Sequence, residues 1–289
     1  MKYEIKKLDI SDFPPMLNEI PDKPTELFYA GIIPKLSENI FLTVVGSRKY
    51  TSYGRDACNE LIASLRGLPV IIVSGMALGT DALAHEAALK NGLKTIAVPG
   101  SGIHPDVIYP RTNYFLEQKI IESGGLLLSE YEPNFKATLW SFPKRNRILA
   151  GISHSTLLIE ASEKSGTLIT ARLTTEYNRD LLVVPGSIFS DQSKGTHQFL
   201  KLGATPITCG QDLREALGFK DETLESNSET KYENCSGEEK TFLDIIIEPM
   251  SRDEIALALQ KPINEISIVI SMLELKGHIK ETGGKIYKV

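Results

Sequence analysis

Two runs of β-branched and aliphatic residues near the start of the chain set the pattern on which the fold is predicted. The runs LTVV, ending at Val45, and VIIV, ending at Val73, each lead into a glycine-containing turn and then into an Ala- and Leu-rich segment with helical periodicity. Continuous apolar runs are typical of strands that are buried on both faces. This stretch therefore predicts the start of a parallel sheet with crossover helices.

The alternation of short apolar runs and helical patterns continues along the chain. Further strands are predicted over Thr95–Val98, Leu126–Ser129, Thr156–Glu160, Leu181–Val184 and Thr205–Thr208. About seven strands with helices between them predict an α/β fold with a Rossmann-like, doubly wound, mostly parallel sheet. Because such sheets bind ligands at the carboxyl ends of their strands, we expect the functional residues in the loops that follow the strands.

The two ends of the chain differ from its middle. Residues 1–40 are interrupted by prolines and only weakly periodic, so we expect extended and turn structure laid against the main domain. Residues 220–240 carry seven Asp or Glu against three Lys, which is typical of a flexible acidic linker. The predicted organisation is a main domain over 1–219, a linker over 220–237 and a small domain over 238–289.

The small domain is predicted to be a winged helix. Helices are expected over Glu238–Ile247, after Ser251 and from Pro262 to Lys276, and a hairpin around a Gly-Gly pair follows. Ser251 and Glu254 have the spacing of a capping box. The segment 251–276 has one net negative charge, and the apolar residues of its last helix have core spacing, so we expect protein contact rather than reading of a DNA sequence.

The loops after the predicted strands are rich in Gly, Ser, Thr and basic residues. A glycine just past a strand turns backbone amides toward solvent at the next helix N-terminus, where they favour an anion. Three such loops are predicted to be phosphate cradles, and they contain Gly46 and Ser47; Gly75, Met76 and Gly79; and Ser165, Gly166 and Thr167. The alternative is ordinary tight turns, or a plain Ser or Thr N-cap in the third loop, because the spacing matches neither the Rossmann nor the P-loop motif.

Cations and aromatic rings are concentrated in two places, the first of these loops and the segment FPKRNR. Cationic groups beside exposed rings are how proteins hold single-stranded nucleic acid, with the charge following phosphate and the ring stacking on a base. The alternative is a solvated helix turn with a buried aromatic residue, but cations at a helix N-terminus oppose the dipole and so favour a ligand. We predict exposed nucleic-acid-binding side chains that contribute little to folding: Arg48, Lys49, Phe142, Lys144, Arg145, Asn146 and Arg147.

Three other side chains could carry chemistry. Glu160 follows a strand and could accept a hydrogen bond from a ribose or a base, or pair with a loop cation as a structural carboxylate. Asp81 and His85 are four residues apart and share a helix face, which would suit acid/base work. Because Asp81 is at helix-capping distance from its turn and no nucleophile is nearby, capping and packing are the favoured roles, and we predict no catalytic residue.

Composition narrows the classes of protein further. The net charge of −5 argues against a wholly basic DNA-coating protein, so a nucleic-acid surface would have to be local. Three widely separated cysteines and scattered histidines indicate neither disulfides nor a metal site, and we predict no metal and no cofactor. With no signal peptide and no apolar run long enough to span a membrane, we expect a cytoplasmic protein without a membrane partner.

An ordered set of motifs resembles the DNA-processing protein A family (DprA, also called Smf). They are VGSRKYTSYGR, SGMALGTDALAHEAAL, VPGSGIHPDVIYPRTNYFL, FPKRNRILAGIS, IEASEKSGTLITA and KGTHQFLKLGA, and they cover most of the main domain. The carboxyl-terminal pattern is similar to that family's winged-helix domain. The helical SAM-like domain of many bacterial members is expected to be absent here, because few residues precede the first strand.

The resemblance implies a function in DNA recombination. It implies a homodimer that binds single-stranded DNA with little sequence preference and helps to load RecA recombinase onto incoming DNA during natural transformation. By the family's motifs, Arg48 and the segment Lys144–Arg147 are associated with DNA.

An enzyme acting on a nucleotide is the alternative function. The fold resembles the phosphoribohydrolases, which use similar glycine loops and a motif of the PGGxGTxxE kind. This chain has PGSG from Pro99 but no G-T-x-x-E after it, which disfavours that alternative.

Overall fold

The computed structural model describes residues 3–219, 235–246 and 249–288. The chain divides into two compact units, Met1–Lys220 and Asp221–Val289, and each is described by itself. Most of the predicted linker, residues 220–234, lies outside the described residues.

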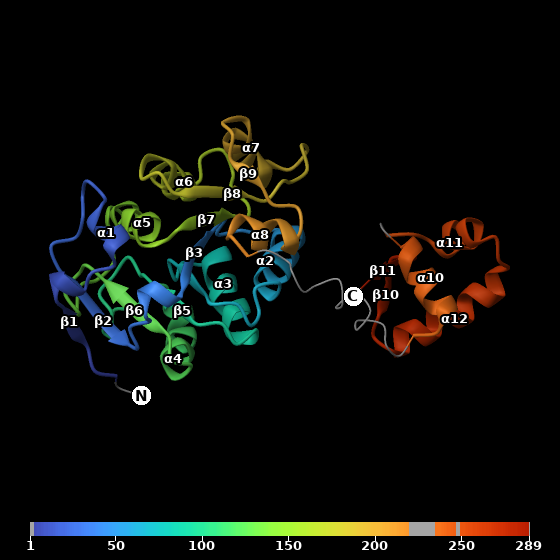
Figure 1. The fold of residues 1–289 in the computed structure, drawn as a ribbon, viewed down its shortest axis with the longest axis horizontal. Coiled ribbons are helices and arrows are strands. Elements are labelled where there is room, and N and C mark those ends of the chain that lie inside the picture. Colours follow the sequence, from blue (N-terminus) through green and yellow to red (C-terminus); the bar gives the residue numbers. More distant parts are fainter. Residues whose placement is uncertain (1–2, 220–234, 247–248, 289) are drawn as a thin grey trace. The chain divides into compact units, whose positions relative to one another are not determined.

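The larger unit is built on a nine-stranded sheet (Figure 1). Its strands lie in the order β1-β2-β6-β5-β4-β3-β7-β8-β9, and all neighbours from β6 to β9 are parallel. The strands are β1 Lys6–Leu8, β2 Leu27–Gly31, β3 Ile40–Val45, β4 Val70–Ser74, β5 Thr95–Ala97, β6 Leu126–Ser129, β7 Ser155–Leu158, β8 Asp180–Val183 and β9 Thr205–Pro206. The predicted mostly parallel, doubly wound sheet is confirmed.

Two strands at one side of the sheet, β1 and β2, were not predicted. β1 and β2 come from the proline-interrupted residues 1–40 and add antiparallel to the edge of the sheet at β6, with Phe28 opposite Ser129. Because β2 is short and lacks a clean alternation, its pairing depends on the edge that β6 offers rather than on a local pattern.

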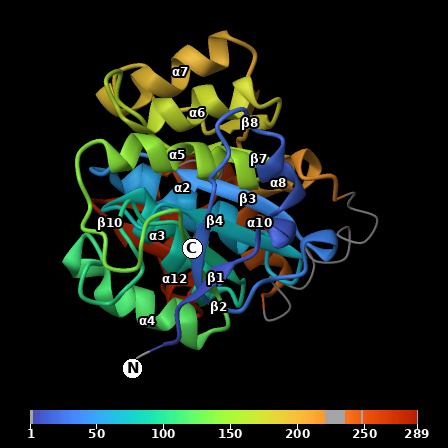
Figure 2. The same cartoon turned by 90° about the vertical axis from the view of Figure 1, so that its left-hand side faces the viewer.

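Helices cover both faces of the sheet. They are α1 Pro15–Asn18, α2 Ser52–Ala63, α3 Thr80–Lys90, α4 Tyr114–Glu122, α5 Ser141–Ile152, α6 Thr167–Glu176, α7 Lys194–Lys201 and α8 Gly210–Ala216. Turned by 90°, Figure 2 shows α5, α6 and α7 on one face and α3 and α4 on the other. Alternate residues of β3 supply the two cores, since Phe41 and Val45 pack with α5 and α6, whereas Leu42 and Val44 pack with α2 and α3.

The direction in which strands are added reverses beside β3. From β3 the chain adds β4, β5 and β6 on one side, and then returns to place β7 on the other side of β3. The ends of β3 and β7 lie in register, with Val45 beside Leu158. In a doubly wound sheet this reversal opens a crevice at the carboxyl ends of the two strands, which is where ligands bind.

The smaller unit is a winged helix. It consists of α10 Gly237–Ile245, α11 Arg252–Leu259, α12 Ile263–Leu275 and a hairpin of β10 Ile279–Thr282 and β11 Lys285–Lys288. The predicted capping box at Ser251 and Glu254 is confirmed, and a second one joins Ser236 to Glu239. The core contains Phe242, Leu243, Ile255, Ile266, Ile270, Leu273, Ile279 and Ile286.

Among the described residues, no single helix is both long and apolar enough to cross a membrane. Only α11 and α12 taken together reach that length and hydropathy, and they are bent by 112° to each other.

Candidate nucleic-acid interface

A hollow of about 570 Å³ lies at the carboxyl ends of β3 and β7, where strand addition reverses. It is lined by the loop after β3, the loop that leads into α6, and the first turns of α5. Ten of the predicted residues line it: Gly46, Ser47, Arg48, Lys49, Phe142, Arg145, Asn146, Ser165, Gly166 and Thr167. The reversal of strand order is therefore what brings together segments that are about a hundred residues apart in the chain.

The loop after β3 is fastened to its neighbours on both sides. The backbone carbonyl of Ser47 accepts hydrogen bonds from the N–H and hydroxyl of Thr80, at 3.1 and 3.0 Å. On the other side, the Thr167 hydroxyl donates to the carbonyl of Gly46 at 2.8 Å. A Cβ on Gly46 would lie 2.6 Å from the Thr80 hydroxyl oxygen, so this close approach requires glycine.

The cations of this loop are available to a ligand. Arg48 and Lys49 are exposed at the edge of the hollow. The Arg48 guanidinium lies 5.5 Å from the centroid of the Phe142 ring, which packs in turn against Tyr109 at 5.8 Å. A cation and two rings from three separate segments thus meet at one rim.

The predicted residues of the second cradle lie outside the hollow. The buried Asp81 carboxyl group accepts from the N–H of Ala77 at 3.3 Å, and burial raises its pKa above the ordinary value. Met76 is fully buried in the core and, like Gly75 and Gly79, lies outside the hollow. Ala77 and Asp81 of the same loop do line the hollow, whereas the glycines serve internal packing, and the role of this loop as a phosphate cradle stays a prediction. Gly79 has a φ of 84°, and a Cβ there would meet the backbone of Arg48 at 2.5 Å.

The third loop opens into the hollow, but its hydroxyl groups are used internally. Ser165 Oγ accepts from the N–H of Thr167 at 3.2 Å, and the Thr167 hydroxyl holds Gly46 as described above. Gly166 has ordinary helical dihedral angles and open space where a Cβ would stand. The N-cap of α6 is Gly166, without a side-chain cap, so the alternative of a plain Ser or Thr N-cap is wrong, and the role of this loop as an anion cradle stays a prediction.

Arg145 is a buried residue. The segment FPKRNR lies inside α5, and Arg145 is only 4% exposed. Its Nη1 donates to the carbonyl of Gly75 at 2.5 Å and to the carbonyl of Val98, so it ties together the ends of β4 and β5. Burial lowers the pKa of Arg145 to about 10, partly offset by the nearby Asp81 carboxylate. The expectation of an exposed loop cation is wrong here, because the guanidinium is held by carbonyl oxygens inside the fold.

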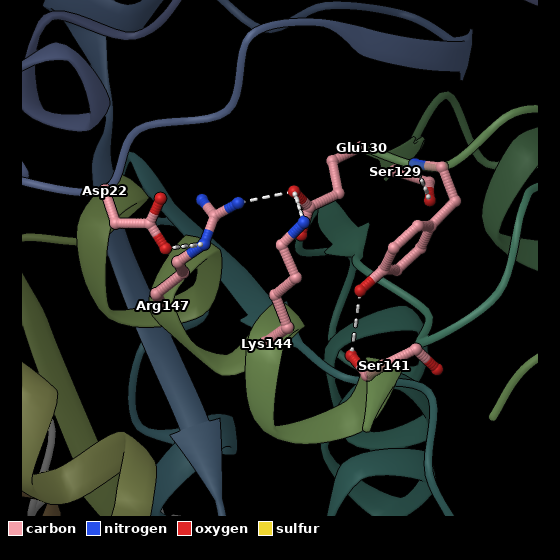
Figure 3. Close-up of polar contacts among 7 residues, drawn as sticks. Asp22, Ser129, Glu130, Ser141, Lys144 and Arg147 are labelled. Atoms are coloured by element: carbon pink, nitrogen blue, oxygen red, sulfur yellow. Dashed lines mark hydrogen bonds and ion pairs between the residues drawn. The ribbon is translucent and has the colours of Figure 1, made fainter. Parts of the chain in front are cut away.

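Arg147 is also buried in α5, and Figure 3 shows it beside Glu130 and Asp22. Its guanidinium pairs with the buried Glu130 carboxylate and, through Nε, with Asp22 at 3.2 Å. Lys144 reaches the same Glu130 carboxylate at 3.4 Å, but its side chain is 46% exposed. Of the three cations in FPKRNR, Lys144 alone matches the predicted exposure.

Asn146 lies beside these cations at the edge of the hollow. Its Oδ1 accepts from Arg145 Nε at 3.2 Å, so the side chain is oriented by the buried arginine. An amide held in this way could read a base edge, and that role stays a prediction.

Sequence reasoning missed part of the apolar wall of the hollow. Tyr109, Leu139 and Ile169 line it, and each of them is exposed. Trp140, next to Leu139, is half-exposed and packs against Tyr131 and Phe135. In the sequence these side chains are large apolar residues in loops that follow strands. Residues of the core have the same appearance, so the sequence could not separate the two.

The remaining polar candidates are structural. Both oxygens of Glu160 accept from Thr51, from its N–H at 2.9 Å and from its hydroxyl at 2.7 Å, which fixes the N-cap of α2. Among the described residues no loop cation forms a salt bridge with Glu160, and acceptance from a ribose or a base stays a prediction. His85 is fully buried, with Nδ1 2.7 Å from the Thr95 hydroxyl, and burial lowers its pKa to about 3. The expected packing role of His85 is confirmed by this position.

Comparison with known proteins shows to which family the chain belongs. The model of the family "DNA recombination-mediator protein A" matches residues 5–218, and that of the "DprA winged helix domain" matches residues 245–285. The chain belongs to the DprA family. It is 42% identical to the DNA processing protein DprA of Streptococcus pneumoniae over 207 residues, which is 72% of each chain. It is 32% identical to the protein Smf of Escherichia coli over 282 residues, covering 96% of this chain and 75% of Smf.

Solved structures of DprA proteins share the fold of the larger unit. The crystal structure of S. pneumoniae DprA matches with a TM-score of 0.67 and 40% identity, covering 73% of this chain and 74% of that one. DNA processing protein A of Helicobacter pylori matches with the same TM-score and 31% identity, covering 74% of this chain and 96% of that one. The H. pylori protein has a single-stranded DNA binding mode that is described as unique.

Proposed function

We propose that the larger unit, over residues 1–219, binds single-stranded DNA across the hollow at the ends of β3 and β7. The observation that carries this proposal is the placement of Arg48 over the Phe142 ring, with Tyr109 and Lys49 beside them at one rim. Cations follow the phosphates of a single strand, and exposed rings stack on its bases. A rim that offers both favours unpaired DNA over a duplex, whose bases are already stacked.

The phosphate contacts are proposed to come mainly from side chains. Several loop amides that could hold an anion are already bonded: that of Lys49 to Ser47 Oγ, that of Thr51 to Glu160 and that of Thr167 to Ser165 Oγ. Three of the predicted cations are exposed, namely Arg48, Lys49 and Lys144. Binding led by side-chain charge predicts little sequence preference and a strong dependence on salt.

We further propose that the protein acts in recombination as its family's name implies. In this proposal it works in the cytoplasm as a homodimer, protects incoming DNA during natural transformation and helps to load RecA. The support is membership of a family of recombination mediators, which covers both units of the chain.

The winged helix is proposed to contact protein rather than DNA. The outward side of α12 carries the exposed apolar residues Ile268, Met272 and Leu275. Arg252, which could have met a phosphate, is paired with Glu281 at 2.6 Å. A helix that reads the major groove would present cations and polar side chains there instead.

A nucleotide-processing enzyme is the less favoured alternative. Asp81 is held by its own turn, His85 is buried against Thr95, and both oxygens of Glu160 are bonded to Thr51. His85 and Glu160 lie outside the lining of the hollow, and Asp81, which does line it, is held by the N–H of Ala77, so the three groups are not arranged together for acid/base work.

An electrophoretic shift of the full chain with single-stranded and duplex oligonucleotides tests the proposal. We expect a shift with the single strand and a much weaker one with the duplex, with no hydrolysis of nucleotide monophosphates in the same samples. Hydrolysis that is lost in Asp81→Asn while DNA binding survives would favour the enzyme instead.

A further inference from the structure

The buried carboxylate of Glu130 lies between two cations, one buried and one half-exposed. Glu130 follows β6 directly, and its side chain is 7% exposed. A buried carboxylate needs compensating charge, and Oε2 finds it in Arg147 and, at 3.4 Å, in Lys144 (Figure 3). Among the described residues, Oε1 has no hydrogen-bond partner.

Only one of the two cations can leave. Arg147 is 6% exposed and is held between Glu130 and Asp22. Lys144 is 46% exposed, and its flexible stem allows Nζ to turn outward without moving the helix. The helix itself is held at its first turn, where the buried Tyr131 hydroxyl donates to the carbonyl of Ser141 at 3.2 Å. A phosphate that binds Lys144 therefore competes with Glu130 for the same ammonium group.

We propose that Glu130 is a positioning residue of the DNA site, which holds Lys144 in the free protein and competes with phosphate for it. The inference rests on the proposed function, because it concerns how tightly that site binds. By holding Lys144, Glu130 lowers the affinity of the protein for DNA. By pairing with Arg147, it also holds α5 in place. Arg48 and Lys144 both lie over an aromatic ring, but of the two only Lys144 forms a salt bridge with a carboxylate among the described residues.

The test is a double-mutant cycle on the full chain, with a fluorescein-labelled oligothymidylate and fluorescence anisotropy. Glu130→Gln removes the charge but keeps an oxygen that can accept from Arg147. We expect the Kd to fall about two- to fivefold at low salt, the range that corresponds to an exposed ion pair. In a Lys144→Ala background the same change should leave the Kd unaltered, because the competition has been removed.

Asp22→Asn is the matched control. It removes one negative charge from the other side of Arg147 without touching Lys144, so its effect on Kd should be the same with and without Lys144. A Glu130→Gln effect that persists in Lys144→Ala, that equals the effect of Asp22→Asn, or that weakens binding would overturn the inference. If the wild type binds DNA and the cycle is additive, only the role of Glu130 fails. If the wild type does not bind, the proposed function fails with it.

A second comparison leaves Glu130 unchanged and so does not depend on the folding of that variant. Because Lys144 must first leave a carboxylate, Lys144→Ala should raise the Kd less than Arg48→Ala does. An equal or larger loss for Lys144→Ala contradicts the competition.

Discussion

Arg145 and Arg147 are buried cations whose partners belong to the protein itself. One holds the carbonyls of Gly75 and Val98, and the other holds the Glu130 carboxylate. Their neighbour Lys144 is the exposed member of the motif. The sequence shows three cations within four positions, but the hydrogen-bond partners of the two buried ones are 17 to 70 residues away along the chain. That distance is why the motif could be recognised while the roles of its members could not be separated.

Replacing Arg147 should therefore lower the stability of the fold, whereas replacing Lys144 should weaken DNA binding and leave stability nearly unchanged. Arg147→Ala leaves the Glu130 carboxylate buried with less compensation and should lower the free energy of unfolding by about 3 kcal/mol. Lys144→Ala should change it by no more than about 0.5 kcal/mol while weakening DNA binding. Urea unfolding can follow the fluorescence of the chain's single tryptophan, Trp140, which is the N-cap of α5. Equal stability of the two variants would contradict the burial of Arg147.

His85 should make stability depend on pH. Its pKa is lowered to about 3 because burial disfavours the imidazolium, whereas in the unfolded chain it is near the ordinary value of 6.5. Between these values only the unfolded chain takes up the proton, so stability is full above pH 6.5 and falls as the pH decreases toward 3. This group alone should contribute a slope of about 1.4 kcal/mol per pH unit.

The control for this prediction is His85→Asn, which keeps a polar group near Thr95 but cannot titrate. The variant should be less stable at pH 7 and should lose less stability than the wild type between pH 6.5 and 4.5. Parallel pH profiles from urea unfolding would show that His85 is not buried in its neutral form.

At the scale of elements, the loop after β3 and the loop before α6 differ in whether their glycine can be replaced by a larger residue. Gly46 lies against the side chain of Thr80, whereas Gly166 faces open space with helical dihedral angles. Gly46→Ala should lower the free energy of unfolding by about 2 kcal/mol, because the added methyl group forces the loops after β3 and β4 apart. It should also weaken DNA binding by moving Arg48.

Gly166→Ala is the matched change at the other loop. It should alter stability by no more than about 0.5 kcal/mol and leave DNA binding in place. The pair is measured by thermal unfolding and by fluorescence anisotropy with a labelled oligonucleotide. Equal losses at Gly46 and Gly166 would mean that both glycines are needed for close approach of the ligand.

Elements with a strong local signal were predictable. Six strands of the parallel part, β3 to β8, contain short apolar runs, and the capping box at Ser251 is readable from two residues. The two residues of β9 are exposed and have a weaker signal. β1 and β2 were not predictable, because a short strand at an edge is decided by the strand it pairs with. The hollow was predicted in its place, at strand ends, and the spacing of Asp81 indicated that it binds its own turn, as its bond to Ala77 shows.

At the scale of the whole molecule, the two units have separate hydrophobic cores. The larger unit has its cores on both faces of the sheet, and the winged helix has its own around Phe242 and Ile270. The net charge of the chain is −5, and the exposed cations at the hollow are local to the larger unit. A chain ending at Phe219 should therefore stay folded and bind single-stranded DNA with nearly the affinity of the full chain. A folded truncation that does not bind would assign the site to the winged helix.

The salt dependence of binding tests the central claim most directly. Phosphate contacts from Arg48, Lys144, Arg145 and Arg147, as the sequence alone suggests, would give a slope of log affinity on log salt of roughly −3. Arg145 and Arg147 are buried, so two of these four remain, and the exposed Lys49 beside Arg48 adds a third cation; at about −0.7 per contact the expected slope is roughly −2. Anisotropy titrations of labelled single strands of different sequence, from low to physiological salt, should give this slope with nearly equal affinities. A flat response, or affinities that differ strongly between sequences, would contradict a site led by these three cations.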